Sequence, residues 1–323
     1  MKIRIAGAIA LLALTFGMPS RAWCAENLWT AYSDGPGITS LPSSKLKKSG
    51  TPKSTLLSTF EVATGLAFDE SNNLWAVVNN NEVVEFTAAQ LKNLKTDPNP
   101  TPGVIITSTS TFDGIFGCAF DAQGNLWIPN YNSDSICELS KAELEAGSAD
   151  LTPAIVISSS DLFRPGFITF DAAGNAWVNS EADFIAEFSA SQLTSSGMKT
   201  PAVILADDGS GTSLDDSGEI VFDSKGNLWV SNYLANTVVE YTAAQIATSG
   251  DPTPNVKLTS SDFNFPWGAA FDAAGNLWIA DYADSKIHKF TAKQLKAGGA
   301  QKPKVSVTGS FEGIWQMVFG PAS

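Results

Sequence analysis

The chain has 323 residues, of which 20 are basic and 33 acidic, and its formal net charge is −13. A charge of this sign repels nucleic acid and anionic lipid surfaces, so neither is expected as a partner. The length suits one large all-β domain.

The first 22 residues have the pattern of a secretory signal peptide. A positively charged start, Met1–Arg4, precedes an apolar run, Ile5–Met18, and small residues follow at the positions that signal peptidase reads. The apolar run is too short for a comfortable transmembrane helix, and no other segment competes with it. We therefore expect a signal peptide over residues 1–22, cleaved between 22 and 25, and a secreted or periplasmic protein without membrane insertion.

One sequence pattern recurs through the rest of the chain. Its clearest form is Phe-Asp-x-x-Gly-Asn-Leu-Trp, as in Phe271–Trp278, and a sixth copy is divided between Asn27–Trp29 and Val318–Gly320. Its phenylalanine returns about every 50 residues, a spacing typical of repeat architectures. The phenylalanines are Phe68, Phe120, Phe170, Phe222, Phe271 and Phe319. A repeat whose parts lie at both ends of the chain predicts a closed ring.

The fifth copy shows how one repeat is expected to fold. Gly268–Phe271 predicts a first strand, and a turn follows in which Asp272 accepts backbone hydrogen bonds and Gly275 adopts the left-handed conformation. Leu277–Ala280 and Lys286–Phe290 predict the second and third strands. The aspartates of the other copies are expected to cap the same turn rather than to bind calcium, and the tryptophans to pack between blades.

A capping box follows the third strand in five of the six copies. Ser or Thr is followed three residues later by Gln or Glu, which predicts a short helical turn before the fourth strand, as over Asn255–Leu258 in one copy. The boxes are Thr87–Gln90, Ser140–Glu143, Ser189–Gln192, Thr242–Gln245 and Thr291–Gln294.

Four antiparallel strands repeated six times predict a six-bladed β-propeller. The N-terminal segment supplies strands two to four of one blade, and Ile314–Phe319 supplies strand one of the same blade. This closure protects the sheet edges. We expect one propeller domain over residues 26–323, and a monomer.

The pattern Gly-x-Ala-Phe-Asp-x-x-Gly-Asn-Leu-Trp, as in Gly268–Trp278, resembles that of NHL-repeat propellers. Relatives of those propellers include the regucalcin/gluconolactonase family, virginiamycin B lyase and strictosidine synthase. The resemblance covers nearly the whole chain after the signal peptide, but the matching residues serve turns and packing, and the helical insert departs from the shorter NHL repeat. It implies a ligand site around the central channel, where first strands begin and second strands end.

Aromatic side chains are predicted to gather on that face of the ring. They are Phe116, Trp267 and Trp315 before first strands, and Tyr131, Tyr233 and Tyr282 after second strands. Such rings suit stacking against a small molecule, a glycan or a peptide, although they could also serve only to plug the channel. The leading hypothesis is a non-enzymatic binding or scaffold module, and a purely structural extracellular protein is not distinguished from it.

The alternative is a periplasmic lactonase or lyase of the regucalcin or virginiamycin B lyase type. It would need Glu219, with Asp281 and Glu181, to bind a metal or to act as general acid and base. Calcium takes six to eight oxygen ligands, and the inner-strand positions hold mainly Phe, Trp, Gly and Thr. No metal or other cofactor is therefore expected, and a divalent cation is the less favoured alternative.

Histidine and cysteine narrow the chemistry further. The single histidine, His288, lies on a predicted third strand, so we expect a surface or half-buried residue and no Ser-His-Asp set or histidine-rich zinc site. Cys118 and Cys137 fall on strands one and three of a blade, about 9–10 Å apart, which favours two buried thiols over a disulfide.

Overall fold

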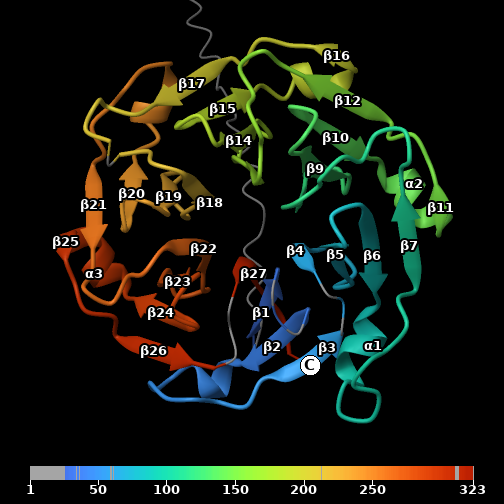
Figure 1. The fold of residues 1–323 in the computed structure, drawn as a ribbon, viewed down its shortest axis with the longest axis horizontal. Helices are drawn as coiled ribbons and strands as arrows, with labels where there is room; N and C mark the ends of the chain where they lie inside the picture. The colour runs from blue at the N-terminus through green and yellow to red at the C-terminus, as the bar shows by residue number, and fades with distance from the viewer. Residues whose placement is uncertain are drawn as a thin grey trace, which may run out of the picture.

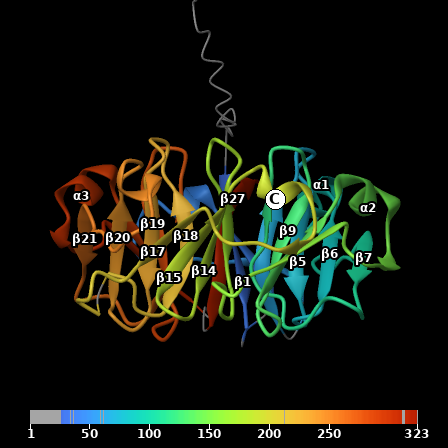
Figure 2. The same cartoon turned by 90° about the horizontal axis from the view of Figure 1, so that it is seen from above.

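The computed structural model describes residues 26–322 except positions 34, 36, 59, 61, 212 and 310–312, and the predicted signal peptide lies outside these residues. The described chain forms six sheets arranged as the blades of a closed ring (Figure 1). Seen from the side, the ring is a flat disc with loops on both faces (Figure 2). The predicted all-β six-bladed propeller is confirmed.

Blades one to three come from both ends and the first part of the chain. Blade one contains β27 (Ile314–Pro321), β1 (Glu26–Tyr32), β2 (Ile38–Pro42) and β3 (Thr55–Ser58). Blade two contains β4 (Ala63–Phe68), β5 (Leu74–Val78), β6 (Glu82–Phe86), β7 (Val104–Thr107) and β11 (Ala149–Asp150). Blade three contains β8 (Ala119–Phe120), β9 (Leu126–Asn130), β10 (Ser135–Leu139), β12 (Ile155–Ser158) and β16 (Gly197–Met198).

Blades four to six continue in chain order. Blade four contains β13 (Ile168–Phe170), β14 (Ala176–Ser180), β15 (Phe184–Phe188) and β17 (Val203–Ala206). Blade five contains β18 (Ser217–Phe222), β19 (Leu228–Asn232), β20 (Thr237–Tyr241), β21 (Val256–Thr259) and β25 (Gly299–Ala300). Blade six contains β22 (Pro266–Phe271), β23 (Leu277–Asp281), β24 (Lys286–Phe290) and β26 (Val305–Thr308).

The ring closes through blade one, as the divided repeat predicts. Strand β27 pairs antiparallel with β1, with Phe319 opposite Leu28 and Val318 opposite Trp29. The indole Nε1 of Trp29 donates to the Pro321 carbonyl at 3.3 Å. The two ends of the described chain are thus joined by backbone pairing.

Each Asp-x-x-Gly-Asn turn is held by the carboxylate of its aspartate. In blade three, Asp121 Oδ1 accepts from the backbone N–H groups of Gln123 and Asn125, both at 2.9 Å. Its Oδ2 accepts from Asn125 Nδ2 at 2.9 Å and from Trp127 Nε1 at 3.0 Å. Gly124 has φ +84°, which favours glycine. The predicted capping role is confirmed here, and the aspartates of blades two, four, five and six make the equivalent bonds.

The strand-two tryptophans pack between blades, as predicted. Each indole meets, edge to face, the strand-one phenylalanine of the next blade, with ring centroids 5.9–6.5 Å apart. The pairs are Trp29–Phe68, Trp75–Phe120, Trp127–Phe170, Trp177–Phe222, Trp229–Phe271 and Trp278–Phe319. One pair of residue types therefore forms every junction of the ring.

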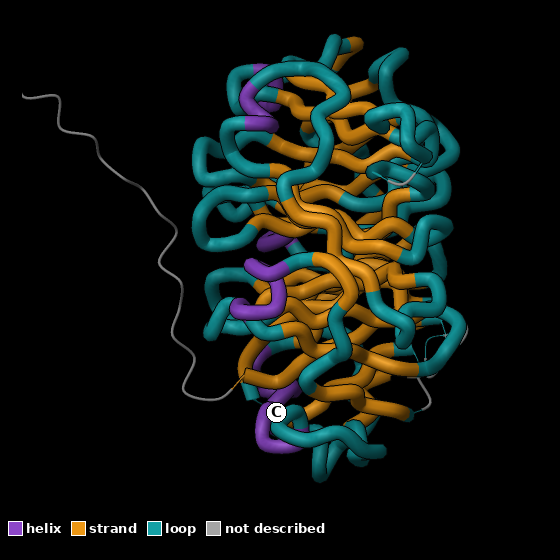
Figure 3. The backbone as a smooth tube through the Cα atoms, turned by 90° about the vertical axis from the view of Figure 1, so that its left-hand side faces the viewer, coloured by secondary structure: helices purple, strands orange, loops and turns teal. Residues whose placement is uncertain are grey.

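Short helical turns follow the third strands, as predicted for blades two to six, and a further one, not predicted, follows in blade one. They are η1 (Ser43–Lys45), α1 (Ala88–Lys92), α2 (Lys141–Ala146), η2 (Gln192–Thr194), η3 (Gln245–Ala247) and α3 (Ala292–Ala297). The capping boxes of α1, α2 and α3 are complete. Figure 3 shows the helices gathered on one face of the disc. This face carries the Asp-x-x-Gly-Asn turns, because the first residues of α1 and α2 donate their backbone N–H groups to the turn residues Asn73 and Asn125, both at 2.9 Å. None of the helices within the described residues is long and apolar enough to cross a membrane.

The sequence predicts four strands in each blade, but three blades have a fifth. Strands β11, β16 and β25 pair in parallel with the outer strands β7, β12 and β21. Each added strand comes from the segment after the helical turn of the following blade, and Gly50 and Gly250 make single bridges of the same kind. The insert therefore covers the outer edge of the preceding blade, which would otherwise present unpaired backbone groups.

Candidate functional site

The two faces of the ring differ, and the predicted site lies on the face where first strands begin, here called the aromatic end. The opposite face carries the Asp-x-x-Gly-Asn turns and is called the turn end. The six predicted binding residues, together called the aromatic cap, are Phe116, Tyr131, Tyr233, Trp267, Tyr282 and Trp315. All six are half-buried.

Ring contacts join the aromatic cap into one continuous cluster. Phe116 stacks on Trp315, with centroids 4.8 Å apart and planes 2° apart, and Tyr131 meets the edge of Phe116 at 4.9 Å. Trp267 meets Trp315 edge to face at 5.0 Å. On its other side, Trp267 contacts Tyr233 at 5.2 Å, and Tyr233 contacts Tyr282 at 5.9 Å. The structure thus brings together every ring that the sequence selected, and the rings pack on one another across the channel while staying partly accessible.

Two indole groups of the cap lack an acceptor. The Nε1 atoms of Trp267 and Trp315 are buried, and no hydrogen-bond acceptor for either lies among the residues that the structure describes. A buried donor without a partner costs about 1–3 kcal/mol. A ligand or water oxygen that reached these N–H groups would recover that cost.

A polar network borders the cap beside Tyr131. The Tyr131 hydroxyl donates to Glu181, and Arg164 Nη1 lies 3.3 Å from the second oxygen of that carboxylate. The Arg164 guanidinium also lies 5.5 Å from the Tyr131 ring centroid. Burial, together with the Glu181 carboxylate, raises the pKa of Tyr131 to about 12. Glu181, a predicted candidate for general acid–base chemistry, is thus held in an ion pair at the rim.

Glu219, the second catalytic candidate, lies in the channel beneath the cap. Its Oε2 accepts from the backbone N–H of Ala269 at 2.6 Å and of Met317 at 3.4 Å, and only 4% of Glu219 is exposed. Burial raises the pKa of its carboxyl to about 8. Gln316 lies beside it and accepts from the Leu66 N–H at 2.7 Å. These two side chains join the first strands of blades five, six, one and two.

Asp281, the third candidate, forms a buried Ser-His-Asp arrangement with His288 and Ser306. This arrangement corrects two predictions, one on the exposure of His288 and one on its partners. Its Oδ2 lies 2.8 Å from His288 Nε2, and His288 Nδ1 lies 2.9 Å from Ser306 Oγ. His288 is 1% exposed, whereas a surface or half-buried residue was predicted, and a Ser-His-Asp arrangement was not expected. The strand register explains it, because Ile279, His288 and Ser306 are direct neighbours across three strands, so they share one face with Asp281.

The three carboxylates do not come together. Glu181 lies at the rim, Glu219 in the channel and Asp281 inside blade six, and they share no hydrogen-bond partner. Asn130 and Asn232, which end second strands on the same face, each use the side-chain oxygen to accept from a backbone N–H, that of Asp113 and of Asp215, both at 3.4 Å. Across the described part of the chain, no cluster of three or more His, Cys, Asp or Glu side chains is arranged to hold a metal ion.

The turn end of the channel contains a cavity that the sequence did not reveal. It has a volume of about 810 Å³, with Glu219 and Gln316 among its lining residues. The six repeated phenylalanines, Phe68, Phe120, Phe170, Phe222, Phe271 and Phe319, also line it. Cys118 contributes a buried free thiol to the wall, and Cys137 is a second buried free thiol, as predicted. The signal for this cavity is the uniform phenylalanine of the repeat, which we assigned only to packing.

Comparison with known proteins agrees with this architecture. Residues 263–290 match the NHL repeat family model. A search of curated proteins found no match. The chain is therefore a six-bladed β-propeller in which one segment, residues 263–290, matches the NHL repeat.

Solved structures share the fold at low sequence identity. A protein of unknown function from Bacteroides caccae is 10% identical, with 92% of this chain and 99% of that chain covered and a TM-score of 0.63. A protein from Lactobacillus plantarum is 16% identical, with 91% and 99% covered and a TM-score of 0.58. Catalytically inactive virginiamycin B lyase from Staphylococcus aureus, with quinupristin, is 15% identical, with 82% of each chain covered and a TM-score of 0.52. The predicted resemblance to NHL-repeat and virginiamycin B lyase-like propellers is confirmed at the level of the fold.

Proposed function

We propose that this protein is an exported, non-enzymatic binding module whose ligand stacks on the aromatic cap. The observation that carries this proposal is the continuous cluster of six half-buried rings across one end of the channel. Export is supported by the signal-peptide pattern of residues 1–22.

The chemistry around the cap favours a glycan over a purely apolar ligand. Flat tyrosine and tryptophan faces suit stacking against a sugar ring. Glu181, Arg164 and Asp216 offer acceptors and a donor to sugar hydroxyls at the rim, and the pKa of Asp216 is raised by burial and by the Glu181 charge. The acceptor-free indole N–H groups of Trp267 and Trp315 favour a ligand rich in oxygen.

A periplasmic lyase or lactonase is the second candidate. Its support is Glu219, a buried carboxyl with a pKa of about 8 at the inner end of a cavity, in a fold similar to that of a lyase solved with quinupristin. Against it stands the separation of Glu219 from Asp281 and Glu181, which leaves no second acid or base beside it among the predicted candidates.

The test is to replace Trp267 and Trp315 together with Ala in the mature protein. A glycan array followed by calorimetry on the glycans that bind should show binding to the native protein and none to the double variant. Leu234→Ala is the matched control, because Leu234 is an exposed apolar residue (55%) next to Tyr233 but outside the cap. Circular dichroism checks that both variants fold.

Unchanged glycan binding by a folded Trp267→Ala, Trp315→Ala variant would overturn the assigned face. The milder pair Trp267→Phe and Trp315→Phe keeps the rings but removes both N–H groups. Weakened but measurable binding by that pair would identify stacking and the indole donors as separate contributions. If the native protein turned over a lactone or quinupristin and the Glu219→Gln variant did not, the lyase or lactonase would be favoured.

A further inference from the structure

A second repeated feature lies at the turn end, outside the proposed site. In four blades, a glutamate on the third strand lies directly opposite the tryptophan of the second strand. The pairs are Trp75–Glu85, Trp127–Glu138, Trp177–Glu187 and Trp229–Glu240. In blade six the same position holds Lys289, opposite Trp278.

Blade six shows how this corner accommodates a positive charge. Lys289 Nζ lies 3.1 Å from Oδ2 of the turn aspartate Asp272 and 5.1 Å from the centroid of the Trp278 ring. An ammonium group gains from both the carboxylate and the face of an indole. The corner formed by a turn aspartate and a strand-two tryptophan is thus an ammonium site that blade six fills with its own side chain.

The other four blades place a second negative group where Lys289 stands. The glutamates of three of these blades have pKa values raised first by burial and then by the turn aspartate; they are Glu85, Glu138 and Glu187. Glu138 and Glu187 are only 6% and 7% exposed. Within the described ranges, neither carboxylate has a hydrogen-bond or ion-pair partner, so two of these corners contain a buried acid without a counterpart.

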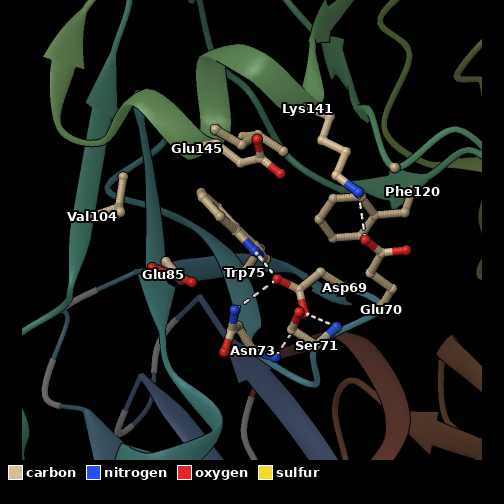
Figure 4. Close-up of a pocket in the computed structure, with 12 residues that line it drawn as sticks. Asp69, Glu70, Ser71, Asn73, Trp75, Glu85, Val104, Phe120, Lys141 and Glu145 are labelled. Atoms are coloured by element: carbon tan, nitrogen blue, oxygen red, sulfur yellow. Dashed lines mark hydrogen bonds and ion pairs between the residues drawn. The ribbon is translucent and has the colours of Figure 1, made fainter.

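The other two of the four corners, those of Glu85 and Glu240, open into equivalent grooves. The first, between blades two and three, has a volume of about 260 Å³ and is lined by Asp69, Trp75 and Glu85. Figure 4 shows these three at its floor, with the apolar side chains of Val104 and Phe120 on opposite sides.

The second groove, between blades five and six, has a volume of about 610 Å³. It is lined by the equivalent Asp223, Trp229 and Glu240, with Val256 and Phe271 as apolar walls. Here Asn255 Nδ2 donates to Glu240 at 2.7 Å, so this acid is already held in place.

We propose that these two grooves bind the primary ammonium group of a ligand with an aliphatic stem, either a lysine side chain or a free alkyl diamine. The Asp and Glu carboxylates receive the ammonium donors, the indole face adds a cation–π contact, and the apolar walls contact the methylene chain. Two carboxylates are too few for calcium, which takes six to eight oxygens. The acidic protein as a whole attracts such cations.

The experiment titrates the folded mature protein with three probes and follows the indole N–H resonances of Trp75 and Trp229 by NMR. The probes are Nα-acetyl-lysine amide, cadaverine and Nα-acetyl-norleucine amide, which lacks the ammonium. Saturable shifts are expected with both amines, and binding of the norleucine probe should be weaker by about tenfold or more. Tighter binding of the lysine probe would identify a peptide source, and tighter binding of cadaverine a free amine.

Glu85→Lys with Glu240→Lys copies blade six into both grooves and should weaken amine binding by about tenfold or more. Glu85→Gln with Glu240→Gln is the second variant, in case the lysines disturb folding. Loss of Trp267 and Trp315, which lie at the other end of the ring and outside both grooves, should leave amine affinity unchanged. Equal affinity for the norleucine and lysine probes, or unchanged amine affinity in a folded Glu85, Glu240 variant, would overturn the proposal.

Discussion

The two ends of this ring differ in how far their residues repeat from blade to blade. At the turn end, blades two to six carry the same aspartate, asparagine and tryptophan with the same hydrogen bonds. At the aromatic end, the residue five positions before each turn aspartate, or its equivalent, is of four different types among the six blades. These residues are Thr64, Phe116, Gly166, Gly218, Trp267 and Trp315.

This difference assigns the stability of the ring to the turn end and the binding of a ligand to the aromatic end. A contact repeated at every junction stabilises the whole ring, and it cannot distinguish one blade from another. Residues that vary around the channel make an asymmetric surface, which is what a specific ligand needs. Blade six is the exception at the turn end. There Lys289 stands at the position that holds a glutamate in four other blades, and its ammonium group neutralises the charge of the turn aspartate Asp272.

The largest expected effect tests the turn end directly. Trp127 is 1% exposed, packs on Phe170 and donates to Asp121. Trp127→Ala should lower the free energy of unfolding by about 3–5 kcal/mol, because it removes a buried indole and leaves a cavity. The half-buried Tyr282→Ala at the aromatic end should cost only about 1 kcal/mol. Urea unfolding of both variants measures the difference, and equal losses would contradict the division between the ends.

The next effect concerns the buried pair that distinguishes blade six. His288→Ala leaves Asp281 as a buried carboxylate without its partner, which should cost about 3 kcal/mol. Lys286→Ala is the matched control on the same strand, because its ion pair with Asp284 is partly exposed and should contribute less than about 1 kcal/mol. A loss no larger than that of the control would show that His288 does not support Asp281.

Features that repeat locally could be predicted from the sequence. Asp121, Gly124 and Trp127 lie close together in the sequence, in one turn and the strand β9 that follows it, and ring closure follows from the divided sixth copy. The aromatic cap could be selected because strand starts and strand ends must meet on one face. All these features need only the repeat and strand alternation.

Features that depend on the alignment of neighbouring strands, or on how a segment of one blade packs against the next blade, could not be predicted. The pair of Asp281 and His288 requires the alignment of β23 with β24, and the fifth strands require knowing where an insert lies against its neighbour. Glu138 illustrates the same limit, because its position opposite Trp127 is visible in the sequence only once the strands are aligned.

The third prediction concerns Glu219, which lies between the two ends. Its pKa is about 8 in the folded protein, against an ordinary value of 4.5, so the folded state holds a proton that the unfolded chain has lost between these values. Its stabilising contribution is complete below pH ~4.5 and falls by about 1.4 kcal/mol per pH unit as the pH rises toward 8.

Glu219→Gln should therefore flatten the pH dependence of unfolding over that range. Glu138→Gln is the comparison, because the Glu138 pKa of about 7 gives the same sign over a narrower range. A Glu219→Gln profile parallel to that of the native protein would show that Glu219 titrates equally in both states.

The smallest expected effect tests how much the helical inserts, which lie at the turn end, contribute to the free energy of unfolding. In the capping box of α1, Thr87 Oγ1 accepts from the Gln90 N–H at 3.3 Å, and Gln90 Oε1 accepts from the Thr87 N–H at 2.8 Å. Gln90 Nε2 also donates to the Thr101 carbonyl at 2.7 Å, so the box ties the helix to the segment that leads into β7.

Thr87→Ala should lower the free energy of unfolding by about 1 kcal/mol, and Thr87→Ser should restore most of it, because only the side-chain oxygen caps the helix. Urea unfolding measures both variants, while the indole N–H resonances of Trp267 and Trp315 in NMR spectra report on the far face of the native protein. If the insert acts only on its own blade, those two resonances stay unchanged. A loss as large as that of Trp127→Ala would mean that the inserts, rather than the tryptophan junctions, hold neighbouring blades together.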